Sequence, residues 1–141
     1  MYHIAQVNIA RLKAPAGDSQ VAGFFDNVSR INELAETSKG FVWRYVDDYG
    51  SDPLLAFNLS VWESIEDLGA FVYRSGHVEI MRRKQEWMQP MVSAHAALWW
   101  IKSGQLPTPA TAMEKLELIS NLGPTPQAFT FSKRFDSPDT L

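Results

Sequence analysis

The sequence predicts an α+β fold built on an antiparallel sheet, and three observations support this prediction. Segments in which apolar and polar residues alternate, as they do in strands, occur at 2–12, 41–48, 54–62 and 94–102. Two stretches between them, at about 18–38 and 64–88, have apolar residues at helical spacing. The order β-α-β-β-α-β, followed by a further helix and strand, is that of a ferredoxin-like domain with a C-terminal addition.

The first strand and the first helix have clear patterns. In the strand YHIAQVNIARL, one face carries His3, Ala5, Val7 and Ile9, and the other carries Tyr2, Ile4, Gln6 and Asn8. The helix from about Asp18 to Ser38 has an apolar stripe that comprises Val21, Phe24, Phe25, Val28, Ile31, Leu34 and Ala35. Gly40 is expected to end this helix.

The third strand, LLAFNLSVW, separates its two faces in the same way. Its apolar face comprises Leu55, Phe57, Leu59 and Val61. Its other face is mixed and comprises Ala56, Asn58, Ser60 and Trp62. We expect the apolar face to lie under the helices, so the mixed face should point the opposite way, together with Gln6 and Asn8.

The second half of the chain supplies start and stop signals. Ser64 and Asp67 have the spacing of a capping pair, and Gly76 interrupts or ends the helix that they begin. A second helical run follows from about 77 to 88. The last helix is expected to start at Thr111 with Glu114 and to stop at Gly123, and AFTFSKRF then places Phe129, Phe131 and Phe135 on one face of a fifth strand.

We expect one domain over 1–141, with a core of about 1–103 and an extension of about 104–141.

Composition narrows the classes of function. The 141 residues are 45% hydrophobic and 21% charged, which is ordinary for a soluble globular protein. A formal net charge of −3 gives little support for a nucleic-acid partner. The chain has no cysteine, so disulfides and thiolate chemistry are excluded. The N-terminal segment lacks the pattern of a secretion signal and no stretch is apolar enough to span a membrane, so a cytoplasmic location is expected.

The mixed face suggests a cavity. Buried amides without partners cost about 1 to 3 kcal/mol each, so carboxamides, a hydroxyl and an indole suit a semi-polar cavity better than a dry core. Two such faces paired in a homodimer would enclose a cavity of this kind.

The motifs WES, YRSGH, LWW, PT and GPTPQAFTF in combination resemble a bacterial family, domain of unknown function 3291, over nearly the whole chain. The resemblance implies a dimeric α+β barrel related to the antibiotic biosynthesis monooxygenases, and it implies no established reaction. Some barrels of this group, including cofactor-independent monooxygenases and haem-degrading proteins, use a first-strand asparagine to hold an oxygenated intermediate. Asn8 matches that position. The other haem-degrading residues do not match, because the expected tryptophan and histidine align with Phe71 and Met81.

Two histidines are further candidates for catalysis. His77 stands at the start of a helix and His95 at the start of a strand, and an imidazole titrates near neutral pH. Each could equally be a capping or packing residue, and Asn8 could be a structural amide. The three histidines of the chain have no HxH, HxxxH or HExxH spacing, so neither a metal site nor a cofactor is expected.

The residues expected to bind a ligand are Gln6, Trp43, Arg44, Tyr45, Asn58, Ser60, Trp62 and Trp87. The aromatic members could instead form ordinary core and dimer interface. Arg44 in the cavity would indicate an anionic or enolate-bearing substrate.

Two functions from different classes follow. The first is an enzyme that oxidises or rearranges an aromatic or polyketide-like compound without metal or flavin, with Asn8, Trp62, His77 and His95 as the residues to test. The second is a non-catalytic barrel that binds a small hydrophobic ligand or only dimerises. Haem binding or degradation is a third and weaker alternative.

Overall fold

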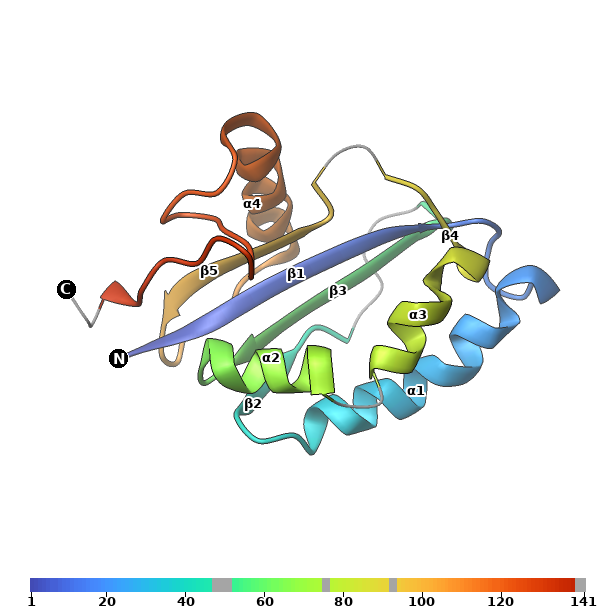
Figure 1. Ribbon diagram of the computed structural model, residues 1–141, viewed down its shortest axis with the longest axis horizontal. Helices are drawn as coiled ribbons and strands as arrows, with labels where there is room; N and C mark the ends of the chain where they lie inside the picture. The colour runs from blue at the N-terminus through green and yellow to red at the C-terminus, as the bar shows by residue number, and fades with distance from the viewer. Residues whose placement is uncertain (47–51, 75–76, 92–93, 139–141) are drawn as a thin grey trace.

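The computed structural model of the chain describes residues 1–46, 52–74, 77–91 and 94–138 (Figure 1). The side chains of residue 74 and of residues 77–81 lie outside the described part, as does Gly76, where the helix was predicted to be interrupted or to end. The strand predicted over 41–48 is observed as far as Arg44, and its last two residues lie outside the described part. No helix among the described residues is long and apolar enough to cross a membrane.

The sheet is antiparallel, and its strand order confirms the predicted ferredoxin-like topology. β1 (Tyr2–Leu12) lies at the centre between β3 (Leu55–Trp62) and β5 (Ala96–Lys102), and β2 (Phe41–Arg44) pairs with the outer edge of β3. A two-residue strand that was not predicted, β4 (Met88–Gln89), continues the β5 side of β1 beside Arg11 and Leu12.

Helices cover both faces of this sheet (Figure 1). A short 3-10 turn, Ser19–Val21, leads into α1 (Ala22–Glu36), which lies with α2 (Ile65–Arg74) and α3 (His77–Trp87) on one side. α4 (Pro109–Leu122) lies on the other side, next to β5.

The apolar face of the sheet packs against α4, and the prediction that α1 to α3 cover it is therefore wrong. This core comprises Ala5, Val7, Ile9, Leu59, Val61, Ala97 and Trp99 of the sheet with Ala112 and Leu116 of α4. The alternation in β1 and β3 shows that their two faces differ, but it does not show which helix covers which face.

The mixed face therefore lies on the side of α1 to α3. Near one end of the strands it is apolar: Ile4, Trp62 and Leu98 form a core with residues of α1 and α2 and with Phe129. The Trp62 ring stacks on Phe71 of α2 with centroids 5.2 Å apart. Towards the middle of the strands the same face becomes polar.

The predicted fifth strand is reduced to a single β-bridge between Phe129 and Leu98, in which both N–H···O distances are 2.8 Å. Thr130 then forms backbone hydrogen bonds with Lys133 instead of with a strand. The predicted shared face is confirmed as packing, because Phe129, Phe131 and Phe135 all join the core beside Ile4 and Trp62.

The helix ends follow the sequence signals with two corrections. Ser64 Oγ accepts a hydrogen bond from Asp67 N (3.0 Å), as the capping pair predicts. α1 ends at Glu36 with Thr37 as its C-cap, so Gly40 does not end the helix as predicted. Gly40 lies in the turn that follows, where its φ is 83° and a side chain would collide with Asp67. α4 begins at Pro109 rather than Thr111, with Thr108 as its N-cap, because proline is favoured in the first turn, where its missing N–H costs nothing.

Candidate ligand-binding site

Four polar side chains lie in the middle of the sheet face that carries α1 to α3. Gln6 is paired with Ser60 across β1 and β3, and Asn8 is paired with Asn58. Since alternate residues of a strand share a face, all four point to the same side as Ile4 and Trp62. We call Gln6, Asn8, Asn58 and Ser60 the amide floor.

A hydrogen-bond network joins three of these residues to Trp62. Gln6 Nε2 donates to Asn58 Oδ1 (2.6 Å) and to Ser60 Oγ (2.7 Å). Trp62 Nε1 also donates to Ser60 Oγ, at 2.9 Å. Ser60 is 6% exposed and Trp62 is 1% exposed, so the inner part of this network, the bond from Trp62 Nε1 to Ser60 Oγ, is shielded from water.

Solvent nevertheless reaches the outer part of the amide floor. Asn58 is exposed, and Gln6 and Asn8 are half-buried, although both strands lie inside the sheet and carry helices on this face. A helical layer packed directly on these strands would bury them. The outer part of the amide floor is therefore open to solvent.

α1 explains this access. Its main contacts are with α3, β2 and the preceding 3-10 turn rather than with the central strands. Only Ala35 of its residues is buried, Val28, Ile31 and Leu34 remain half-buried, and Phe25 is 40% exposed. α1 therefore does not cover the central strands with a closed apolar layer.

Arg44 lies on the edge of the amide floor. It is paired with Ser60 across β2 and β3 and therefore shares the face of Ser60 and Gln6. Its Nε donates to Glu36 Oε2 at the end of α1 (2.9 Å), and its side chain is 23% exposed. Glu36 neutralises the charge of Arg44. Beside this ion pair is a hollow of about 490 Å³, whose described lining comes from α1 and comprises Arg30, Glu33, Leu34, Glu36 and Thr37.

The remaining predicted site residues do not join the amide floor. Trp43 and Tyr45 lie on the opposite face, in the core beneath α4, with ring centroids 6.4 Å apart. Trp87 is buried at the far end of the helical layer with Leu12 and Val21. The predicted ligand set is thus divided among three places, and sequence alternation alone could have separated only Trp43 and Tyr45 from Arg44.

The two candidate histidines are placed differently. His95 is exposed, and its carbonyl oxygen accepts a hydrogen bond from Ile9 N (2.8 Å). Because Ala96 is opposite Asn8, His95 falls on the α4 side of the sheet and does not converge with the amide floor. His77 is the first residue of α3, in the helical layer on the amide-floor side, and its side chain lies outside the described part.

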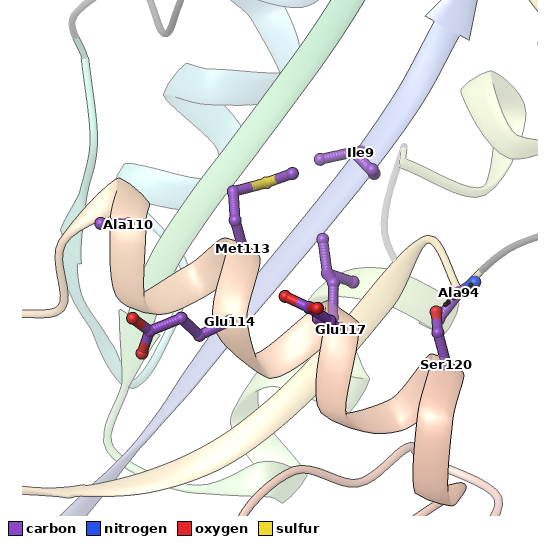
Figure 2. Close-up of a pocket in the computed structure, with 8 residues that line it drawn as sticks. Ile9, Ala94, Ala110, Met113, Glu114, Glu117 and Ser120 are labelled. Carbon is purple, nitrogen blue, oxygen red and sulfur yellow. Dashed lines mark hydrogen bonds between the residues drawn. The ribbon is translucent and has the colours of Figure 1, made fainter.

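A second hollow, which sequence analysis missed, lies between α4 and the sheet (Figure 2). It measures about 330 Å³ and is lined by Ile9, Ala94, Ala110, Met113, Glu114, Leu116, Glu117 and Ser120. Figure 2 shows Met113 directed at Ile9 of β1, whereas Glu114 points away, and Ala94 N donates to Ser120 Oγ (3.2 Å). None of the predicted site residues lines this hollow.

The described residues include no cluster that suggests a metal site. They contain no group of three or more histidine, aspartate or glutamate side chains that could hold a metal ion. Asp52, which lies shortly before β3, is a carboxyl group with a shifted pKa. A hydrogen bond from Leu54 N and the guanidinium of Arg11 hold its pKa below the ordinary value.

The chain is a ferredoxin-like α+β protein whose sheet carries a group of polar side chains, the amide floor, on the face that bears α1 to α3. Residues 3–141 match the family described as domain of unknown function DUF3291, and the chain belongs to this family. No curated protein sequence matches the chain significantly.

Solved structures share the fold at low sequence identity. A conserved protein from Methanosarcina mazei Go1 is 18% identical with a TM-score of 0.55, over 72% of this chain and 93% of that one. SnoaB, a cofactor-independent oxygenase from Streptomyces nogalater, is 13% identical with a TM-score of 0.53, over 77% and 99%. A proposed antibiotic biosynthesis monooxygenase from Nitrosomonas europaea is 13% identical with a TM-score of 0.51, over 73% and 90%.

Proposed function

We propose that the chain binds a small aromatic molecule over the amide floor and oxidises it with molecular oxygen, without metal or flavin. The proposal rests mainly on the amide floor. Its polar side chains lie in the middle of the sheet face that carries α1 to α3, and solvent still reaches them. The likeness in fold to SnoaB, a cofactor-independent oxygenase, supports the choice of reaction.

The chemistry requires an electron-rich substrate. Molecular oxygen reacts without a cofactor when a carbanion or enolate transfers an electron to it, so the site must hold a substrate that loses a proton from carbon. Amide and hydroxyl donors aimed at the substrate oxygen favour the enolate form. Asn8 supports this role, because its carboxamide has no hydrogen-bond partner among the residues that the structure describes.

A non-catalytic ligand-binding protein is the alternative, and the amide floor serves it equally well. The predicted homodimer and the cytoplasmic location remain predictions. Pairing of two bare sheet faces does not account for a dimer, because α4 occupies the apolar face and α1 to α3 lie over the other. A second copy would have to use another surface.

Anthrone is a suitable probe, since its methylene group is acidic and its oxidation is balanced: anthrone and one molecule of oxygen give anthraquinone and one molecule of water. We expect the protein to accelerate this reaction, measured as oxygen uptake with anthraquinone formed in equal amount. Binding of anthrone without turnover would support the non-catalytic alternative. Absence of both binding and turnover would contradict the proposal.

The two histidines offer a matched pair of variants for the proton transfer. We expect His77→Ala to lower the rate of anthrone oxidation by about a hundredfold, the usual minimum for loss of a general base. His95→Ala should retain the rate, because His95 is exposed on the opposite side of the sheet. Equal rates for the two variants would show that His77 is not the base.

A further inference from the structure

The directions of the hydrogen bonds determine what the amide floor offers to a ligand. Both hydrogens of Gln6 Nε2 are used, one by Asn58 Oδ1 and one by Ser60 Oγ. The carboxamide oxygen of Gln6 is therefore turned away from these two partners. It forms no hydrogen bond with the described residues and remains an acceptor.

Ser60 and Asn58 offer donors. Ser60 Oγ accepts from Gln6 Nε2 and from Trp62 Nε1, which occupies both of its lone pairs, so its own hydrogen can only be donated. Asn58 Oδ1 faces Gln6, so the two hydrogens of Asn58 Nδ2 are directed elsewhere. No acceptor for these donors exists among the described residues.

The donors and the acceptor are adjacent, because the oxygen and nitrogen of Gln6 share one carbon atom and that nitrogen contacts both Asn58 and Ser60. A ligand that satisfies both kinds of group must present an acceptor and a donor next to each other. A carbonyl oxygen beside a hydroxyl group on a neighbouring carbon meets this requirement.

Charge excludes an anion as the preferred ligand. The cation on this face that the structure describes next to Ser60 is Arg44, and Glu36 neutralises it at 2.9 Å. A carboxylate ligand would have to displace Glu36 from a half-buried guanidinium, and its own desolvation would not be compensated by the neutral amides. This inference replaces the hypothesis of an anionic substrate, which depended on Arg44 in the cavity, whereas an enolate can still form from a neutral bound molecule.

We propose that the amide floor selects a neutral α-hydroxy ketone on an aromatic framework, with the carbonyl oxygen on Asn58 Nδ2 and the Ser60 hydroxyl, and the ligand hydroxyl on the Gln6 oxygen. The inference rests on the proposed binding of a small molecule at this site and names the chemical class of that molecule. It does not depend on whether the molecule is oxidised.

Three bicyclic probes separate these requirements by isothermal titration calorimetry of the whole chain. They are 2-hydroxy-1-tetralone, 1-tetralone, which lacks the hydroxyl, and 1-naphthoate, which is anionic. We expect 2-hydroxy-1-tetralone to bind about fivefold more tightly than 1-tetralone, as one net hydrogen bond provides, and 1-naphthoate to bind most weakly.

Asn58→Asp is the matched variant. Aspartate keeps the acceptor for Gln6 Nε2 but removes the outward N–H donors and places a negative charge against the carbonyl oxygen. We expect the affinity for 2-hydroxy-1-tetralone to fall at least about tenfold, since a donor is lost and a repulsion is added. Asn121→Asp, which adds the same charge at an exposed position of α4, should leave the affinity unchanged.

The outcomes distinguish this inference from the proposed function. Equal affinity for 2-hydroxy-1-tetralone and 1-tetralone, tighter binding of 1-naphthoate, or no effect of Asn58→Asp would overturn the inference and leave a small-molecule site standing. Failure of every probe, anthrone included, to bind would instead overturn the proposed function. An unfolding temperature of Asn58→Asp within a few degrees of that of the parent chain would show that the variant is folded. A loss of affinity could then not be attributed to unfolding.

Discussion

Leu116→Ala is expected to lower the free energy of unfolding by about 2 to 5 kcal/mol, the range for truncating a buried leucine. Leu116 is 4% exposed and packs into the core between α4 and the sheet. Alanine keeps the helix propensity of α4, so the loss would report packing alone. Urea denaturation followed by circular dichroism would measure it.

Leu122→Ala is the control for this experiment. Leu122 is the last residue of the same helix and is 67% exposed, so its truncation should change the free energy of unfolding by less than about 0.5 kcal/mol. If Leu116→Ala were as mild as Leu122→Ala, α4 would not hold the apolar face of the sheet. That face would then be open to a second subunit.

Ser60→Ala is expected to lower the free energy of unfolding by about 1 to 3 kcal/mol, more than a serine to alanine change usually costs. The substitution leaves Trp62 Nε1, on a side chain that is 1% exposed, without its acceptor. Gln6 Nε2 loses one of its two acceptors as well. Equilibrium urea denaturation again gives the value.

Ser29→Ala provides the comparison, because Ser29 is exposed in α1 and alanine is the better helix former. It should be neutral or slightly stabilising. A Ser60→Ala variant as stable as Ser29→Ala would mean that Trp62 Nε1 is satisfied by water, so the inner part of the network would not be dry.

The fold was largely predictable because its signals are local. Alternation in β1 and β3 and helical spacing in α1 depend on residues close in sequence, and the structure confirms these elements. The order of elements then restricts the sheet to few arrangements. The prediction of a fifth strand was wrong because Phe129 pairs with one distant residue, Leu98, and the chain then turns at Thr130.

The site was predictable only in part. The shared face of Gln6, Asn8, Asn58 and Ser60 follows from period-two alternation, and the structure keeps them together. Which layer they face depends on how α4 returns to the sheet, and that is a tertiary choice. The contact between Arg44 and Glu36 likewise joins a strand to a helix end and has no sequence signal.

The most direct test of the account is a nitrogen-15 correlation spectrum recorded during titration with 2-hydroxy-1-tetralone. The chain has five tryptophans, whose indole N–H signals report different places. The signal of Trp62, which donates to Ser60 beneath the amide floor, should shift, while those of Trp43 and Trp99 in the α4 core should not. Shifts confined to Trp43 and Trp99 would place the ligand on the other face and contradict the account.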